Sequence, residues 1–371
     1  MSTSGRELCL LHLGIGQVGR ALVQQLLARR QELQADYGLK IRYLGLATSR
    51  GALLEPSGFS AEELQQTLAL AATKRSLSEL GSGDFVASIP EAIAIAGGWQ
   101  LPGAVLIDTT ASDELAPELA QALGRGFDVV LSNKKPLAGT LAEYQALQDA
   151  CRQSGTRLRY EATVGAGLPV IHTLETLIQT GDELLEIQGS LSGTLGFICT
   201  SLEDGLPFSQ ALERARRLGY CEPDPRQDLE GLDVARKMLI LARRWGLPWE
   251  PEALQLESMI SNELSQEPTV AAFLARLPQL DEEYRQRAEG ARASGQVWRY
   301  IATVSPEGGS VRLAAVERES SFGQLRGTDS LVQFKTARYR ESPLIIRGAG
   351  AGPEVTAAGV FGDLLALAGV L

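Results

Sequence analysis

Residues 8–19 read Leu-Cys-Leu-Leu-His-Leu-Gly-Ile-Gly-Gln-Val-Gly. The first six form a mostly apolar run of strand length, as expected for a buried parallel strand. Gly14, Gly16 and Gly19 follow, and a helical apolar pattern runs from residue 18 to 34. The first glycine permits a tight turn, the second admits a phosphate close to the backbone, and the third lets helix and strand pack closely. This order predicts a dinucleotide-binding loop with a phosphate at the helix N-terminus; the alternative is a purely structural glycine turn.

The rest of the chain extends this α/β pattern. Further strands are expected at 41–47, 104–108 and 128–131, with helical segments between them, so the sequence predicts a Rossmann-like doubly wound sheet. From 170 to 300 the pattern is mainly helical, with a strand near 186–191 and a hairpin at 297–316. A short strand at 344–346 precedes a closing helix at 356–371. We therefore expect a dinucleotide-binding domain of residues 1–160 plus 343–371, with an inserted α+β substrate-binding and dimerisation domain at 161–342.

The end of the second strand predicts which dinucleotide is bound. An enzyme that uses NAD places an acidic residue there, on the ribose hydroxyls. Here the strand ends Ala-Thr-Ser-Arg-Gly at residues 47–51, without an acid. Arg50 suits a 2′-phosphate, so NADP(H) is the preferred cofactor and NAD(H) the second option. The alternative is that Arg50 is a solvated loop residue.

Composition excludes several classes of protein. Of the 371 residues, 44% are hydrophobic and 22% are charged, as in ordinary globular domains. The net charge of −10 argues against a nucleic-acid partner, and no apolar run is long enough to span a membrane. The four cysteines are far apart and the N-terminus lacks a signal-peptide pattern, so free thiols and a cytoplasmic location are expected.

Lysine is rare, which makes each lysine informative. The chain has six lysines among 35 basic residues, although the base composition of the gene can also favour arginine. Arginine cannot replace a lysine that must transfer a proton. Lys134 and Lys135 follow the strand at 128–131, and Thr109, Thr110 and Ser112 follow the strand at 104–108. Ligands bind at the carboxyl ends of such strands, so these residues are candidates for the active site; a basic surface loop is the alternative for the lysines.

Carboxylates gather between residues 219 and 237. Glu222 and Asp224 lie in a loop that prolines make rigid, and Asp228 follows. The helix expected from Gly231 is apolar over most of its surface, yet it carries Asp233 and Lys237 one turn apart. These two residues form either an ion pair at the helix end or charged groups that line a buried cleft. The simplest form of the first alternative is an ion pair on the surface.

Together these motifs resemble the homoserine dehydrogenases. The resemblance spans nearly the whole chain and is carried, in order, by residues 14–19, 132–135, 160–169, 191–196, 219–225, 231–237 and 348–359. The Glu-Pro-Asp-Pro loop and the Leu-Asp-Val-Ala-Arg-Lys helix are the most specific of these motifs. The segment 340–371 is similar to the dehydrogenase half of bifunctional aspartokinase–homoserine dehydrogenases. The resemblance is to a short, monofunctional form, and we expect neither a kinase half nor a C-terminal regulatory domain.

The resemblance implies an NAD(P)-dependent oxidoreductase acting on a CH–OH group. Its reaction is the reduction of L-aspartate 4-semialdehyde to L-homoserine, and the reverse, in threonine, methionine and isoleucine biosynthesis. Lys237 is the implied acid/base group, and Lys134 is implied to lie near nicotinamide and substrate. A homodimer is expected, with the 297–316 hairpin pairing across it. The remaining implied residues of the catalytic and substrate site are Asp233, Gly219, Glu222 and Asp228. Together with the residues argued above, the cofactor contacts are Gly14, Ile15, Gly16, Gln17, Val18, Gly19, Arg50, Thr109, Thr110, Ser112, Lys134 and Gly352. The resemblance also implies a sodium ion held by Glu161, Val164, Ala166 and Leu168.

Two departures and two alternative functions remain. Gln227 stands where many relatives have a second acid, and the doubled lysine leaves open whether Lys134 or Lys135 takes the family role, although the register with Asn133 favours Lys134. An NADP-dependent semialdehyde oxidoreductase of another type, such as aspartate-semialdehyde dehydrogenase, needs a nucleophilic cysteine, and no cysteine lies in a motif with a base. A non-catalytic NADPH-sensing protein needs the glycines but has no use for Glu222, Asp233 and Lys237 together.

Overall fold

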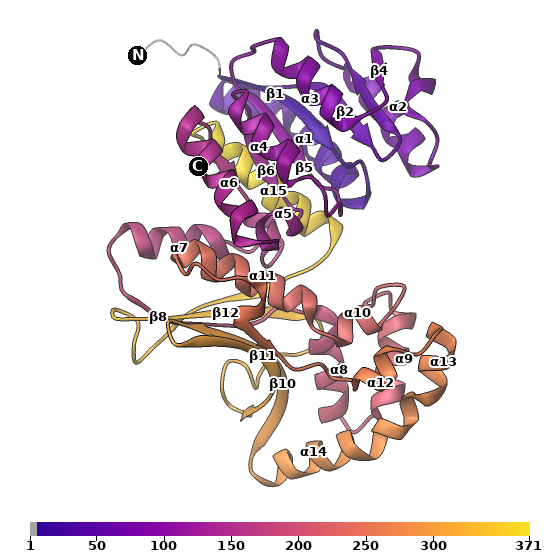
Figure 1. The fold of residues 1–371 in the computed structure, drawn as a ribbon, viewed down its shortest axis with the longest axis vertical. Coiled ribbons are helices and arrows are strands. Elements are labelled where there is room, and N and C mark those ends of the chain that lie inside the picture. Colours follow the sequence, from indigo (N-terminus) through magenta and orange to yellow (C-terminus); the bar gives the residue numbers. More distant parts are fainter. Residues whose placement is uncertain (1–5) are drawn as a thin grey trace. The chain divides into compact units, whose positions relative to one another are not determined.

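The computed structural model describes residues 6–371 and divides into two compact units (Figure 1). Unit 1 comprises Met1–Gly167 and Gly352–Leu371, and unit 2 comprises Leu168–Ala351. Unit 2 is therefore inserted into the chain of unit 1, ahead of the last helix. Both boundaries lie further along the chain than the expected boundaries at residues 160 and 343.

Unit 1 is built on a seven-stranded sheet in the order β4-β3-β2-β1-β5-β6-β7. The strands from β2 to β7 in this order are parallel, whereas β3 and β4 add antiparallel pairs at one edge. The four strands predicted from sequence are present. The strands are β1 (Arg6–Leu13), β2 (Leu39–Thr48), β3 (Gly51–Leu54), β4 (Asp84–Val86), β5 (Ala104–Asp108), β6 (Asp128–Leu131) and β7 (Leu158–Arg159).

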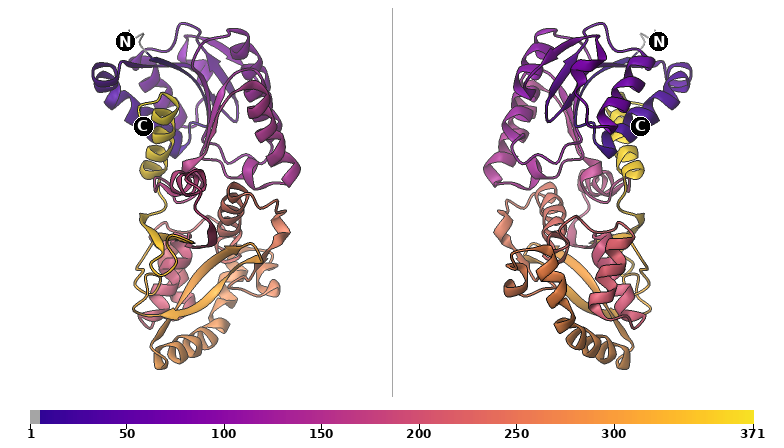
Figure 2. Two further views of the ribbon diagram at one scale, coloured as in Figure 1. Left: turned by 90° about the vertical axis from the view of Figure 1, so that its left-hand side faces the viewer. Right: turned by 90° about the vertical axis from the view of Figure 1, so that its right-hand side faces the viewer.

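Helices cover both faces of this sheet. In Figure 2, α1 (Gln17–Tyr37) and α15 (Pro353–Leu367) lie on one face, and α4 (Ala116–Gly124) and α6 (Leu141–Ser154) on the other. Apolar residues of β1, β2, β5, α1 and α15 form one continuous buried core. The predicted doubly wound α/β fold is confirmed. The remaining helical segments are α2 (Ala61–Ala72), η1 (Leu77–Leu80), α3 (Ile89–Gly98), α5 (Lys135–Ala138) and η2 (Glu161–Thr163).

Unit 2 contains a six-stranded sheet in the order β13-β12-β8-β10-β11-β9. The expected hairpin is present as an antiparallel pair of long strands, β10 and β11. The chain returns to unit 1 at Gly352 and not at the expected residue 343, because β13 pairs along its whole length with β12 and so remains in unit 2. The strands are β8 (Leu184–Ser190), β9 (Leu254–Leu256), β10 (Gln296–Ser305), β11 (Gly308–Glu317), β12 (Asp329–Thr336) and β13 (Leu344–Ala349).

Two helices of unit 2 position the residues of interest. Both α8 (Gly193–Glu203) and α11 (Leu232–Trp245) pack against β10, so the ends of β8, α8 and α11 lie close to one another. The other helical segments are α7 (Val170–Gln179), α9 (Phe208–Arg217), α10 (Arg226–Leu229), η3 (Pro251–Ala253), α12 (Asn262–Ser265), α13 (Val270–Arg276), η4 (Leu277–Leu280) and α14 (Asp281–Ala293). Among residues 6–371, no helix has both the length and the apolar character that crossing a membrane requires.

Candidate active site

The glycine loop joins β1 to α1 and its three glycines have separate roles. Gly14 has φ +93°, and a Cβ there would lie 2.8 Å from the backbone carbon of Thr109. A Cβ on Gly19 would lie 2.1 Å from the carbonyl oxygen of Gly14. A Cβ on Gly16 would meet no protein atom within 4 Å. The protein's own packing thus requires the first and third glycines, whereas Gly16 faces open space.

The N-terminus of α1 fits the phosphates of a dinucleotide. Gly16 is the N-cap, no side chain caps the helix, and its first turn carries no acid. Unpaired N–H groups and the positive end of the helix dipole favour an anion at such a position. Of the other predicted contacts in the loop, Ile15 is buried, Val18 is half-buried and Gln17 is exposed. The predicted phosphate site therefore consists mainly of backbone groups of the glycine loop and of the first turn of α1.

A buried histidine that sequence reasoning overlooked supports this loop. The Nε2 atom of His12 lies 3.0 Å from the hydroxyl of Thr109, which in turn lies 2.5 Å from the carbonyl oxygen of Gly14. Since the Thr109 hydroxyl has one proton and donates it to a carbonyl, His12 Nε2 is the donor to that hydroxyl. Complete burial lowers the pKa of His12 to about 3, so the ring is neutral. The predicted contact Thr109 thereby fixes the glycine loop from within the protein.

The loops after β5 and β6 are tied together. The buried carboxylate of Asp108 accepts the N–H of Thr110 at 2.8 Å and the Asn133 amide at 3.0 Å, and burial raises its pKa. The same amide donates to the carbonyl of Ser112 at 2.9 Å. Neither Asp108 nor Asn133 was predicted as a site residue, although both flank predicted residues. These bonds place Thr110 and Ser112 beside the start of α5.

The structure distinguishes the two adjacent lysines. The Lys135 ammonium donates to the carbonyl of Ala111 at 2.8 Å and forms an ion pair with Asp113 at 2.6 Å. Lys135 is thus engaged in holding the loop after β5. Lys134 is the half-buried N-cap of α5. The family role of Lys134 stays a prediction.

Two other predicted cofactor contacts lie at turns of unit 1. Arg50 is in the tight turn between β2 and β3, where its side chain is exposed. Its backbone N–H donates to the hydroxyl of Thr48 at 3.2 Å, which orders the turn. Gly352 is the N-cap of α15, with φ +123°. A side chain at Gly352 would be strained, and its carbonyl accepts the N–H of Thr356 at 3.0 Å.

Lys237 is the central charged residue of unit 2. It is 8% exposed, and its ammonium lies 2.7 Å from the Asp233 carboxylate and donates to the carbonyl of Leu191 at 2.7 Å. The side chain of Asp233 is 47% exposed. The interpretation as a simple surface pair is therefore wrong, because the ammonium is buried and is held from two different elements. Such burial of an amine requires these partners.

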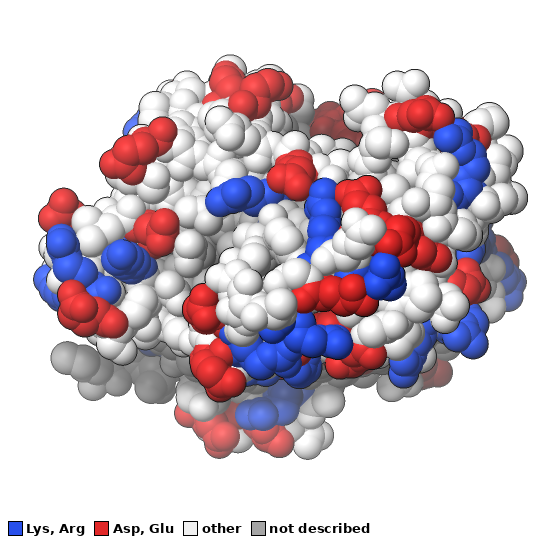
Figure 3. Space-filling view, turned by 90° about the horizontal axis from the view of Figure 1, so that it is seen from below, with Lys and Arg blue, Asp and Glu red and all other residues white. Residues whose placement is uncertain are grey.

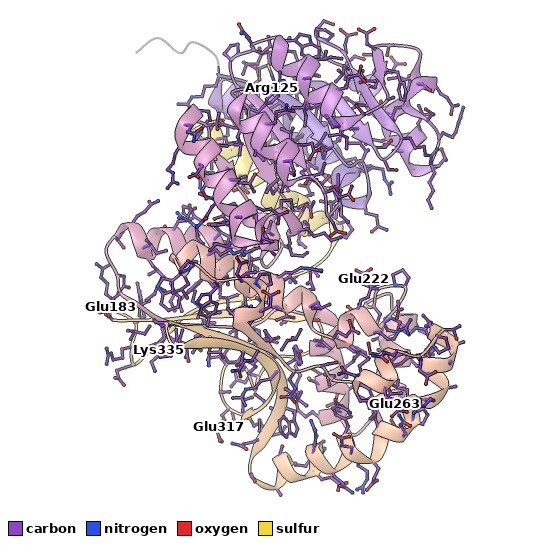
Figure 4. The ribbon with its side chains drawn as sticks, in the orientation of Figure 1. Arg125, Glu183, Glu222, Glu263, Glu317 and Lys335 are labelled. Carbon is purple, nitrogen blue, oxygen red and sulfur yellow. The ribbon has the colours of Figure 1, made fainter. Side chains whose placement is uncertain are left out.

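The second carboxylate of the site organises the loop at 219–225. Asp228 accepts the hydroxyl of Thr194 at 2.9 Å and the N–H of Glu222 at 2.8 Å. Burial raises the pKa of Asp228, and the nearby charges of Glu222 and Asp233 add to this increase. Gly219, with φ +74°, ends α9 and starts the loop. The side chain of Glu222 is exposed and lies at the margin of unit 2, ahead of α10 (Figure 4).

These contacts converge on one segment. Leu191 and Thr194, at the start of α8, contact Lys237 and Asp228 respectively. The sequence marked residues 191–196 only as part of the resemblance, so their role as the common support of lysine and carboxylate was missed. An ammonium beside a carboxylate, with a second exposed carboxylate nearby, can donate a proton and bind a cationic group.

The predicted sodium positions follow β7. Glu161 begins the turn η2, Val164 and Ala166 are buried, and Leu168 is the first residue of unit 2. Gly165 and Ala166 both have positive φ, at +79° and +57°. Backbone carbonyl oxygens, which are the predicted ligands, suit a hard cation. The described residues contain no cluster of His, Cys, Asp and Glu that would favour a transition metal. The sodium ion at this turn stays a prediction.

The cysteines do not fit a thioester mechanism. Burial raises the pKa of every one of the four thiols, to about 11 for Cys199 and about 12 for Cys221, where Asp228 adds to the effect. A nucleophilic cysteine needs a lowered pKa. None of the four thiols thus has the lowered pKa that the cysteine-dependent alternative requires.

Comparisons with known proteins agree with the geometry. The family model described as the NAD-binding domain of homoserine dehydrogenase matches residues 14–161, and the homoserine dehydrogenase model matches residues 169–365. The homoserine dehydrogenase of Emericella nidulans is 36% identical, with 95% of this chain and 96% of the relative covered. A hyperthermophilic archaeal homoserine dehydrogenase solved with NADPH has a TM-score of 0.75 at 23% identity, with 98% of each chain covered, which shows a shared fold.

Some relatives are much longer. The chloroplastic bifunctional aspartokinase/homoserine dehydrogenase 1 of Zea mays is 38% identical over 97% of this chain, and the chain spans 38% of that relative's length. The matches to the family models and to the fungal enzyme nevertheless cover almost all of the chain described here. The chain belongs to the homoserine dehydrogenase family.

Proposed function

We propose that the chain catalyses the NAD(P)H-dependent reduction of L-aspartate 4-semialdehyde to L-homoserine and its reverse, a step in threonine, methionine and isoleucine biosynthesis. Membership of the homoserine dehydrogenase family supports this function. The single observation that carries it is the buried ammonium of Lys237, held by Asp233 and the Leu191 carbonyl. A reaction that transfers a proton to oxygen needs a donor that is held in place in this way.

The reduction of an aldehyde to an alcohol adds a hydride to carbon and a proton to oxygen. Bound NAD(P)H supplies the hydride. Lys237 donates the proton to the developing alkoxide oxygen and accepts it back in the reverse direction. Asp233 holds the ammonium in place through its carboxylate, which is 2.7 Å away. Because Asp233 is half exposed, it also connects Lys237 with water, from which the proton is restored.

The substrate is an amino acid, so its ammonium needs a carboxylate. We assign this role to Glu222, whose side chain is exposed on its loop. Asp228 has both carboxylate oxygens engaged by Thr194 and by the Glu222 backbone, which supports a positioning role for it rather than direct contact with the substrate. Gly219 supplies the turn that starts the loop. Lys134, rather than Lys135, is proposed to contact nicotinamide and substrate.

NADP(H) is proposed as the preferred cofactor over NAD(H). Arg50 lies in the turn after β2, and no acid stands at that strand end. A guanidinium there binds a 2′-phosphate, whereas an acid would bind the ribose hydroxyls. Thr110, Ser112 and Gly352 complete the proposed contacts. The archaeal neighbour was solved with NADPH, which is consistent with this choice.

A structural sodium ion is proposed at Glu161, Val164, Ala166 and Leu168. Its ligands would be mainly backbone carbonyls of the turn after β7. The ion takes no part in the chemical step and stabilises the turn. The consecutive left-handed residues Gly165 and Ala166 support this, because an L-residue adopts such a backbone only where its surroundings stabilise it.

We propose a cytoplasmic homodimer that binds neither nucleic acid nor membranes. In the sheet of unit 2, Gln188, Thr303 and Gln333 are in register and half-buried, on the face opposite the buried Ile187 and Val304. A second copy would cover this polar face. Acidic and basic side chains are interspersed over much of the face drawn in Figure 3, and the net charge of −10 argues against a nucleic-acid partner. Light scattering of the purified protein tests the dimer.

Activity assays test the central proposal. The purified protein should reduce NADP+ with L-homoserine and oxidise NADPH with L-aspartate 4-semialdehyde, followed by the absorbance of the reduced nicotinamide. Oxidation of the semialdehyde instead of its reduction would identify the cysteine-dependent alternative. Tight NADPH binding with no turnover in either direction would identify a sensing protein.

A further inference from the structure

One face of α15 lies against the turn that follows β7. The Oδ2 atom of Asp363 accepts the backbone N–H of Glu161 at 2.8 Å, and Asp363 is only 7% exposed. A Cβ on Gly359 would lie 2.5 Å from the carbonyl oxygen of Ala166. These two helical residues are four positions apart, so they share a face of the helix. The helix therefore contacts the turn at two of the proposed ligands, Glu161 and Ala166.

The close approach at Gly359 fixes the direction of the Ala166 carbonyl. Any larger residue at position 359 would push that carbonyl away, because its Cβ would lie 2.5 Å from the oxygen. The same Cβ would lie 3.3 Å from the Cα atom of Ala162, so the turn has little room to move aside. Ala166 has φ +57°, which is uncommon for an L-residue with a Cβ. Tertiary packing must hold this backbone conformation. The helix α15 provides that packing from about 200 residues further along the chain.

We propose that Gly359 and Asp363 are positioning residues for the turn of residues 161–168, which carries the proposed sodium ligands. This inference rests on the sodium site proposed above. Carbonyl ligands have no flexible side chain with which to adjust, so their direction is set by the backbone and by what packs on it. Gly359 sets the carbonyl of Ala166, and Asp363 sets the backbone of Glu161. The buried carboxylate of Asp363 also contributes negative charge beside a site for a cation.

A matched pair of glycine substitutions on α15 tests the inference. Gly359→Ala places a Cβ against the Ala166 carbonyl. Gly362→Ala introduces the same methyl group on the same helix, where a Cβ would meet nothing within 4 Å. The melting temperature of each protein is measured while NaCl replaces choline chloride at constant ionic strength. This titration gives the Na+ concentration at half of the stabilisation, independently of catalysis.

The wild type and Gly362→Ala should share one Na+ midpoint. For Gly359→Ala the midpoint should increase by about 10- to 100-fold, the usual effect of losing a residue that orients metal ligands. An unchanged midpoint in a folded Gly359→Ala protein would overturn the inference while leaving the sodium site intact. A wild type that shows no preference for Na+ over choline would overturn the sodium site itself, and the inference with it.

Asp363→Asn provides a second measurement if Gly359→Ala does not fold. Asparagine keeps an oxygen that can accept the Glu161 N–H but removes the charge. We expect this variant to fold and to require more Na+ than the wild type, by a smaller factor than Gly359→Ala. A midpoint equal to that of the wild type would contradict the role of the Asp363 charge.

Discussion

The glycine loop of unit 1 presents backbone to its ligand, whereas the site of unit 2 presents side chains. Gly14, Gly16 and Gly19 lie within six residues and act through conformation and the absence of a Cβ. Lys237 instead depends on Leu191, which is 46 residues away, and Asp228 depends on Thr194, 34 residues away. The first site can be recognised in a short stretch of sequence. The second exists only where three elements of unit 2 meet, so single side-chain changes should affect the two sites differently.

The largest effect is expected at Lys237. Lys237→Ala removes the proton donor and should lower kcat by about 10²–10⁴-fold, the usual contribution of general acid–base catalysis. Lys237→Arg should restore little activity, because guanidinium keeps its proton. The affinity for NADPH, measured by fluorescence titration, should hardly change. A folded Lys237→Ala enzyme with near-normal kcat would refute the assignment, since a purely structural ion pair would alter the melting temperature and leave turnover intact.

The second effect tests whether the glycine loop acts through backbone alone. Gly16→Ala should leave the melting temperature almost unchanged, because a Cβ there meets no protein atom within 4 Å. The methyl group would occupy the space for the pyrophosphate, so the Kd for NADPH should increase about 10- to 100-fold, which corresponds to a clash of roughly 1–3 kcal/mol. Gly98→Ala, another open glycine of unit 1, should change neither quantity. Normal NADPH binding by Gly16→Ala would show that the phosphates lie elsewhere.

A smaller effect concerns the choice of cofactor. Arg50→Glu should lower the ratio of kcat/KM for NADP+ to that for NAD+ by about tenfold or more, because a charge-assisted contact is lost and a repulsion is gained. The unfolding midpoint should not move, since the Arg50 side chain is exposed. Steady-state kinetics with both cofactors measure the ratio. A wild type that prefers NAD+, or a ratio that does not change, would show that Arg50 is a solvated loop residue.

The smallest effect is a pH dependence of stability at Asp228. Its pKa is raised in the folded protein above the ordinary value of 3.8, mainly by burial. The folded state therefore binds the proton more tightly than the unfolded state, and the wild type loses stability from this group as the pH increases from about 4 through the raised pKa. Asp228→Asn lacks this loss. The melting temperature of the wild type minus that of Asp228→Asn should therefore fall by a few degrees between pH 4 and pH 7. A constant difference across that range would contradict the raised pKa.

Local sequence patterns predicted much of the fold. The strands at β1, β2, β5 and β6 and the β10–β11 hairpin are present because buried strands and glycine-rich turns leave strong local patterns. The strand β12 and the place of β13 were missed, since the pairing of β12 with β8 and of β13 with β12 is not encoded in any of these segments alone. For the same reason the predicted boundary at 343 lies before β13.

The sequence by itself determined the glycine loop, the candidate carboxylates, the rarity of lysine and the family likeness, because each depends on residue identity at short spacing. Only the tertiary structure decided that Lys237 is buried, that Lys135 is engaged with Asp113, and that Asp228 holds the Glu222 loop. The tertiary structure also showed that the carboxylate of Asp363 accepts the backbone N–H of Glu161, 202 residues away in the chain. Burial and hydrogen-bond partners are properties of contacts between distant segments, and those contacts form only when the sheets and helices pack.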